Sequence, residues 1–337
     1  SDTGEATVNS PLTFTPANWD TPQTVTVTGV NDGSVVDGNQ ASTVTVSVND
    51  GSSNDSFDPL ADQTVSVTTT DNDVPGFTVT ESGGSTSVNE SGTTDTFTVV
   101  LNAQPTSDVL FSLTASDATE ASVTTSLTFT PANWNTAQTA TVTGLNESTV
   151  DGDQTSVITI SIVDAVSNDS FDPVVDQTVT VTTVDNDTAG FTVVQSGGST
   201  SVSEAGTTDT FTVVLNAQPI SDVVLTVTSS DTGEATVNSP LTFTAGNWNS
   251  AQTVTVTGAD DNIIDGTITS TITIAVDDAN SDNSFDPVAN QTVSATTTDN
   301  DSAGFTLTQS GGTTSVSEAS TTDTFTIVLN AQPASDV

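Results

Sequence analysis

The sequence predicts an all-β protein built from tandem antiparallel β-sandwiches, and three observations support this. Val, Ile, Leu and Phe alternate with Thr and Ser at a period of two, the pattern of a strand with one buried and one solvated face. Helical periodicity is missing from the sequence. A seven-residue motif consists of Asp-Asn-Asp, two variable residues and Gly-Phe. It begins at Asp71, Asp185 and Asp299, 114 residues apart each time, so the chain is a repeat protein.

The strands of one repeat follow from this alternation and from the turn residues between them. Gly197-Gly198, the Asn-Ala-Gln-Pro of 216–219 and the Asn-Ser-Phe-Asp-Pro of 283–287 are turn sequences. The apolar–hydroxyl segments that they separate are 210–215, 223–228, 241–243, 253–257, 271–276 and 292–295. About seven short strands per 114 residues is typical of an immunoglobulin-like sandwich.

The phase of the repeat gives the expected domains. Residues 74–187 and 188–301 are each a complete repeat, whereas residues 1–73 form the C-terminal part of one. Residues 302–337 supply the N-terminal strands of a further repeat, which we expect the next copy to complete. A piece of this size with open strand edges is not expected to be stable alone.

The charge of the chain is extreme and has one sign. It has 43 Asp and Glu residues and no Lys, Arg or His, so nothing within the chain can neutralise its acids. Bound cations are therefore expected. Nucleic acid is excluded as a partner, because no cationic side chain can displace counterions from phosphates. No apolar run of about 18 residues is present, so membrane insertion is not expected. The absence of Cys excludes a disulfide framework.

The acidic motifs resemble those of the Calx-beta repeats of sodium–calcium exchangers and large bacterial surface proteins. The resemblance is carried by Val-Ser-Glu-Ala-Gly at 202–206, the strand pair of 241–243 and 254–256, the Asp-Asp-Asn-Ile-Ile-Asp of 260–265 and the closing Asp-Asn-Asp of 299–301. It implies that calcium is bound at one end of each sandwich. Hard divalent cations prefer six to eight oxygen ligands, which carboxylates from several loops can supply.

Carried over residue by residue, the resemblance implies a ligand set for each repeat. For 188–301 the set is Glu204, Asp231 or Glu234, Asp260, Asp261, Asp265, Asp299 and Asp301, with the Ile263 carbonyl as a backbone ligand. For 74–187 it is Glu90, Asp117 or Glu120, Glu147, Asp151, Asp185 and Asp187, with Asn146 in place of Asp260. The first 73 residues offer Asp2, Glu5, Asp32, Asp37, Asp71 and Asp73, and the last segment offers Glu318, which we expect to complete the site of the following copy.

Most of the other sequence features have ordinary structural interpretations. Most Asp and Asn residues are ordinary turn residues, and the Trp of each repeat is expected to cover the core rather than to bind a sugar. Thr-x-Thr runs are ordinary solvated strand faces rather than an ice-binding surface. Sequons such as Asn54-Asp55-Ser56 allow glycans as partners, although several lie in the proposed metal loops. Without His, Cys, Lys, Arg or Tyr, and with its acids recurring in every repeat, the chain is not expected to be an enzyme.

Together these features predict a calcium-stiffened structural protein, extracellular or at a bacterial cell surface. Such a protein would form a fibre, sheath or surface layer by end-to-end continuation with copies of itself, as a homopolymer or as a longer tandem array. The alternative is the stalk of a large bacterial adhesin, with the ligand-binding tip outside this sequence.

Overall fold

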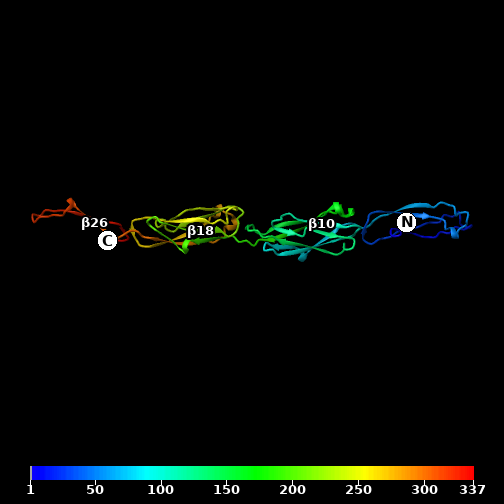
Figure 1. The fold of residues 1–337 in the computed structure, drawn as a ribbon, viewed down its shortest axis with the longest axis horizontal. Coiled ribbons are helices and arrows are strands. Elements are labelled where there is room, and N and C mark those ends of the chain that lie inside the picture. The colour runs from blue at the N-terminus through cyan, green and yellow to red at the C-terminus, as the bar shows by residue number, and fades with distance from the viewer. Residues whose placement is uncertain (1) are drawn as a thin grey trace. The chain divides into compact units, whose positions relative to one another are not determined.

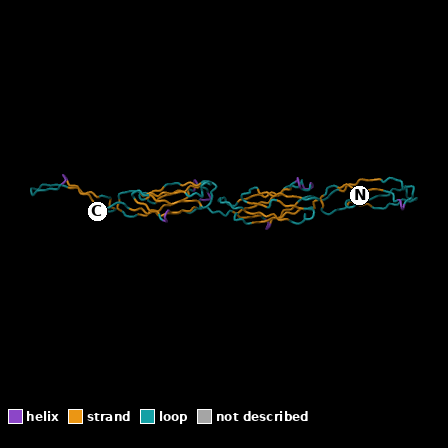
Figure 2. The backbone as a smooth tube through the Cα atoms, viewed as in Figure 1, coloured by secondary structure: helices purple, strands orange, loops and turns teal. Residues whose placement is uncertain are grey.

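The computed structural model describes residues 2–337 and contains almost only strands and loops (Figures 1 and 2). The helical segments in this part of the chain are 3-10 turns of three residues each. The chain divides into two units, Ser1–Glu147 with Asp153–Val184, and Ser148–Gly152 with Asp185–Val337.

The first unit contains a sandwich of a four-stranded and a five-stranded sheet. The four-stranded sheet has the order β11 (Ala121–Val123), β13 (Gln138–Gly144), β8 (Thr94–Leu101) and β6 (Phe77–Glu81). The five-stranded sheet has the order β12 (Ser126–Phe129), β10 (Val109–Ala115), β14 (Gln154–Ile162), β15 (Gln177–Val184) and β7 (Thr86–Asn89). Neighbouring strands are antiparallel except for β15 and β7, which are parallel.

The second unit repeats this sandwich with the same strand orders. One sheet is β16 (Phe191–Gln195), β18 (Thr208–Leu215), β22 (Gln252–Gly258) and β20 (Ala235–Val237). The other is β17 (Thr200–Ser203), β25 (Gln291–Thr298), β24 (Ile268–Val276), β19 (Val223–Ser229) and β21 (Leu241–Phe243). The all-β, tandem-sandwich fold class is therefore confirmed. The sheets hold more strands than the alternation predicted, because short segments such as Thr200–Ser203 and Ala235–Val237 also pair.

The alternation of the sequence decides which face of each strand is buried. On β18, Phe211, Val213 and Leu215 are buried, whereas the residues between them are only partly buried. These side chains belong to one hydrophobic cluster in the second unit, and their counterparts from Phe97 onward belong to another in the first unit. Trp134 and Trp248 pack against these clusters, whereas Trp19 is 71% exposed.

Residues outside the two sandwiches form two-stranded sheets. In the first unit, β1 (Ala6–Val8) pairs with β2 (Val27–Gly29), and β4 (Gln40–Val46) pairs with β5 (Gln63–Thr69). In the second unit, β26 (Phe305–Gln309) pairs with β27 (Phe325–Leu329). Phe305 is 64% exposed, whereas its repeat equivalent Phe191 is 3% exposed. Completion of this segment by a following copy remains a prediction.

Short parallel pairings join the acidic loop of one repeat to the Asn-Ala-Gln-Pro turn of the next. In the first unit, β3 (Val35–Val36) pairs with β9 (Gln104–Pro105). In the second unit, β23 (Ile263–Ile264) pairs with β28 (Gln332–Pro333), and Thr149 forms the equivalent bridge with Gln218. Three recurrences in one chain indicate that this pairing is a regular part of the repeat.

Asp209, near the start of β18, fixes the turn that precedes β17. Its carboxylate accepts hydrogen bonds from the Ser196 hydroxyl at 2.7 Å, from the Ser201 N–H at 2.8 Å and from the Thr210 N–H at 2.7 Å. These bonds lower the pKa of Asp209, the Ser196 hydroxyl having the largest effect. The stabilisation is therefore present above the ordinary Asp pKa and is lost as the pH falls through the lowered folded-state pKa.

We expect Asp209→Asn to lower the free energy of unfolding of the second sandwich by about 1.5–3 kcal/mol, the range for hydrogen bonds to a charged group. Urea unfolding at neutral pH measures the loss, which should shrink as the pH falls through the folded-state pKa. Asp278→Asn, at an exposed aspartate of the same unit, is the matched control. Equal effects of the two substitutions at neutral pH would contradict the anchoring role.

Candidate metal centre

In the second unit, the strand pairing brings four acidic segments to one end of the sandwich. Ser203 pairs with Thr298 at the ends of the parallel strands β17 and β25, so Glu204 and Asp299 follow side by side. Ala235 pairs with Gly258, which places Glu234 beside the loop that begins after β22. Ile268 pairs with Thr297, which brings the start of β24 to the same end. Acidic residues that are far apart in the sequence thus converge, because the strands next to them start or end at the same end of the sandwich.

Two triplets of carboxylates meet at this end and share one residue. Glu204, Glu234 and Asp261 have oxygens within 4.8 Å of one another, and so do Glu204, Asp299 and Asp301. Glu204 is 1% exposed and Glu234 is 5% exposed. Oε2 of Glu234 and Oδ2 of Asp301 are buried and have no hydrogen-bond partner. Buried carboxylate oxygens of this kind are costly without a cation.

Backbone N–H groups use some of the other carboxylate oxygens and fix the loops. Oε2 of Glu204 accepts a bond from the Asn300 N–H at 3.1 Å, and Oδ1 of Asp261 accepts one from the Ile263 N–H at 2.7 Å. Asp299 accepts from the Asp301 N–H at 2.6 Å and from the Gly266 N–H at 2.9 Å. The loop 260–266 and the triplet 299–301 are therefore held together directly.

The concentration of negative charge changes the protonation of the cluster. Burial, followed by the charges of Asp265, Glu204, Asp231 and Asp261, raises the pKa of Glu234. The Asn300 N–H lowers the pKa of Glu204, but burial and the neighbouring aspartates outweigh it, so the net shift is upward. The chain has no Lys, Arg or His that could compensate these charges. A divalent cation would remove both the repulsion and the desolvation cost.

The structure distinguishes between the two acids left open before the short strand of each repeat. Asp231 is exposed and its Oδ1 accepts a hydrogen bond from the Gly233 N–H at 2.9 Å, as in a turn. Asp117 is also exposed and accepts from the Thr119 N–H at 2.9 Å. Glu234 is buried, and so is its counterpart Glu120, which is 6% exposed. The glutamates are thus the better candidates for ligands.

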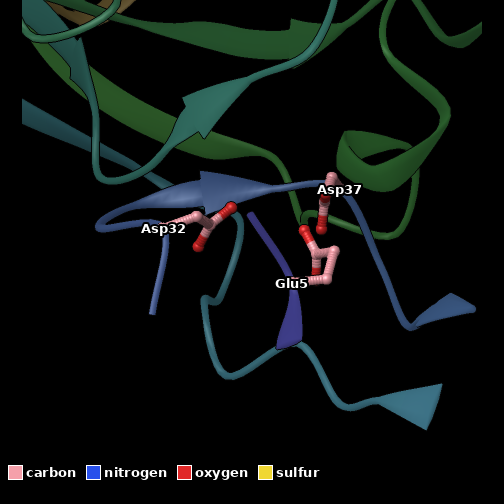
Figure 3. Close-up of side chains that lie close together, drawn as sticks. All are labelled: Glu5, Asp32 and Asp37. Atoms are coloured by element: carbon pink, nitrogen blue, oxygen red, sulfur yellow. The ribbon is translucent and has the colours of Figure 1, made fainter. Parts of the chain in front are cut away.

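The first unit holds a related cluster. Glu5, Asp32 and Asp37 have oxygens within 4.8 Å of one another, with Asp32 and Asp37 on either side of β3 (Figure 3). Asp71 accepts bonds from the N–H groups of Asp37 at 3.1 Å and Gly38 at 2.8 Å. Burial and then neighbouring aspartates raise the pKa of Glu5, and burial and Asp71 raise that of Asp73.

The remaining predicted ligands fall into three groups. Glu90, 1% exposed, follows β7 in the first unit, where Glu147 is partly buried. In the second unit, Asp185 accepts bonds from the N–H groups of Gly152 at 2.8 Å and Asp187 at 2.7 Å. Asp151, in the second unit, is partly buried. The last four predicted ligands are exposed and belong to no carboxylate triplet, and Asp2 and Asp260 accept hydrogen bonds from other loop residues: Asp2, Asp260, Asp265 and Glu318.

Two contributors to the centre were missed from the sequence. Asn300 donates its side-chain amide to Asp260 at 2.8 Å, in addition to its backbone bond to Glu204. Gly258 lets β22 approach the residue before Glu204, because a Cβ there would lie 2.0 Å from the Ser203 carbonyl oxygen. Gly144 has the same close approach to Asn89. The signal was available, since a Gly ends the same Thr-Val-Thr strand in all three copies.

Comparisons with known proteins give resemblances of fold. No protein-family model matches the sequence, and no curated protein matches it. Similar solved structures include the calcium binding domain CBD12 of CALX1.1, with 15% identity over 59% of this chain and 80% of that chain and a TM-score of 0.25. Domains 4 and 5 of the S-layer protein SbsC have 18% identity over 56% and 76%, with a TM-score of 0.27.

A longer SbsC structure, domains 4–9 of this surface layer protein, has 16% identity over 85% of this chain and 38% of that chain, with a TM-score of 0.24. At these values the fold of the chain is established by its own sheets, and the similarities add nothing about its function. Within residues 2–337, no helix has the length and apolar character needed to cross a bilayer.

Proposed function

We propose that this chain is a calcium-binding structural repeat protein of the Calx-beta type. It would act outside the cell or at a bacterial cell surface, and it would continue end to end with copies of itself. The observation that carries the proposal is the pair of carboxylate triplets that share Glu204, together with the buried and unpartnered Oε2 of Glu234.

Calcium fits this donor set better than other common metals. The ligands are oxygens from loops, with neither His nor Cys in the chain, which disfavours zinc and the softer transition metals. Magnesium dehydrates reluctantly and prefers few protein ligands, whereas calcium accepts six to eight oxygens at variable geometry. Glu204, Glu234, Asp261, Asp299 and Asp301 would hold the ion or ions in the second unit.

The function would be mechanical rather than catalytic. Each ion would connect the end of β17, the start of β20, the loop after β22 and the end of β25, so one site would tie together segments almost 100 residues apart in sequence. It would also cancel repulsion among acids that nothing else in the chain can neutralise. Rigid repeats would then extend a fibre, sheath or surface layer.

Replacing Glu204 by Gln tests the proposal, because Gln keeps the shape and removes the charge. With calcium present we expect at least about a tenfold loss of affinity at this site, the scale on which metal sites respond to loss of supporting groups. In a chelator the same substitution should stabilise the protein slightly, because one buried charge is gone. Calorimetric calcium titration and thermal unfolding measure the two effects.

The matched control is Glu318→Gln at the equivalent position of the last segment, where the side chain is exposed and belongs to neither triplet. It should leave the affinity of the second unit's site unchanged. Calcium affinities that are equal in the wild type and in Glu204→Gln would refute the proposed site, and absence of calcium binding by the wild type would refute the function.

A further inference from the structure

The acidic loop of each repeat contains two adjacent residues that pair with the following repeat, and the second of them is apolar in every copy: Val36, Val150 and Ile264. In the first unit this pair is Val35–Val36, and β3 lies parallel to β9 of the following repeat. The Gln104 N–H donates to the Ser34 carbonyl at 2.6 Å. In the second unit, the Gln332 N–H donates in the same way to the Asn262 carbonyl at 2.7 Å. The backbone contact is therefore the same at both places.

The second residue of each pair contacts the following repeat, and Val36 is buried in it. Val36 is 4% exposed and belongs to the same buried cluster as Phe77 and Ala103. It nevertheless belongs to the preceding repeat, because it comes before the Asp-Asn-Asp motif at 71–73 in the sequence. Val150 packs against the hydrophobic cluster of the second unit, and Ile264 lines an apolar pocket with Phe305 and neighbouring residues. Removal of a valine side chain from water by a neighbouring repeat stabilises the contact between the two repeats.

The short loop that contains Val36 also contains two of the acidic residues of the carboxylate cluster. Asp32 and Asp37 flank Val36, and both belong to the triplet with Glu5 (Figure 3). Asp37 also contacts the Asp-Asn-Asp motif at 71–73, because its N–H donates a hydrogen bond to the Asp71 carboxylate at 3.1 Å. In the second unit, Asp261 accepts a hydrogen bond from the Ile263 N–H at 2.7 Å, and Asp299 accepts one from the Gly266 N–H at 2.9 Å. Ordering the loop for one contact therefore orders it for the other.

We infer that Val36 and its counterparts Val150 and Ile264 are docking residues that fix each repeat to the next, and that this docking is coupled to cation binding by the shared loop. The partner surface is the Asn-Ala-Gln-Pro turn and the adjacent apolar end of the following sandwich. Because binding free energies are reciprocal, docking raises the affinity of the loop for the cation as much as the cation favours docking. The coupling rests on the proposed function, whereas the docking itself does not.

The full chain, which has no Cys, permits a direct test with two spin labels. Ser66→Cys on β5 and Thr128→Cys on β12 are exposed and lie on either side of the Val36 contact. Double electron–electron resonance then gives the width of the distance distribution between the labels. We expect a narrow distribution in calcium for the wild type and a broad one for Val36→Asn in the same buffer.

The control is Val35→Asn, on the same short strand but outside the buried cluster, and it should keep the narrow distribution. A milder variant, Val36→Ala, guards against misfolding. We expect its distance distribution to narrow only at a free calcium concentration roughly 5-fold or more above the concentration that narrows the wild-type distribution, which is the lower end of ordinary coupling between sites. Circular dichroism verifies that each variant remains folded.

The outcomes separate the two parts of the inference. A distribution for Val36→Asn as narrow as that of the wild type in calcium would overturn the docking role. If the wild-type distance distribution is equally narrow in calcium and in chelator while that of Val36→Asn is broad, docking would be established and the coupling overturned. If equilibrium dialysis finds no calcium bound to the wild type, the proposed function fails, and the labels still decide whether Val36 docks the repeats.

Discussion

Removing calcium with a chelator should lower the stability of the chain more than any single surface substitution. The reason is that 43 acidic residues face no Lys, Arg or His, and the buried carboxylates of Glu204 and Glu234 would lose the counter-charge that the proposed calcium supplies. A ligand at 1,000 times its dissociation constant stabilises the state that binds it by about 4 kcal/mol per site. We therefore expect a marked fall in melting temperature in EGTA, which scanning calorimetry measures.

Two controls identify the cause of this change. Restoring calcium should restore the melting temperature fully, whereas the same concentration of magnesium should restore less, because magnesium prefers fewer protein ligands. Raising the salt concentration in chelator should recover only the part due to screened surface repulsion. Superimposable unfolding curves with calcium and with EGTA would contradict the metal-stiffened repeat.

Replacing Phe111 by Ala should cost about 3–5 kcal/mol in the stability of the first sandwich, the range for removal of a buried aromatic side chain. Phe111 is fully buried on β10. Its ring meets Phe77 edge-on at 4.8 Å between centroids and Phe129 at 5.7 Å. Loss of the ring removes both contacts and leaves a cavity between the two sheets. Calorimetry should show a large downward shift of one unfolding transition.

The comparison within the same chain makes this prediction specific. The second sandwich has its own hydrophobic cluster, with Leu225 at the position equivalent to Phe111, so its transition should not move. Val157→Ala, on the neighbouring strand β14 where the side chain is 38% exposed, should change stability by less than about 0.5 kcal/mol. A Phe111→Ala effect as small as this control would mean that the ring does not support the core.

Much of the fold was predictable because a strand buried on one face records that face in its own sequence. In the run Thr210–Leu215, the apolar residues Phe211, Val213 and Leu215 occupy every second position, and those three are the buried residues. The short strands β17 and β20 were not found, because three or four residues give too little alternation to separate a strand from a loop. They pair only because the longer strands β25 and β22 offer them an edge.

The candidate site was predictable in its residue types but not in its geometry. The resemblance to Calx-beta repeats, supported by recurrence and the lack of cations, pointed to Glu204, to Asp231 or Glu234, and to the closing Asp299 and Asp301. Sequence could not separate Asp231 from Glu234, since both lie in the same acidic turn. Burial separates them, because the pairing of Ala235 with Gly258 carries Glu234 into the end of the sandwich and leaves Asp231 in solvent.

By itself, then, the sequence determined a repeating, all-β, exclusively anionic protein whose acids recur in phase with its strands. Only the tertiary structure decided which acids meet, since loops separated by up to about a hundred residues come together only when the parallel pair β17 and β25 closes the sheet. It also decided that Val36, one apolar residue inside an acidic loop, is buried in the core of the following repeat. Such a contact depends on two repeats at once, and local alternation cannot record it.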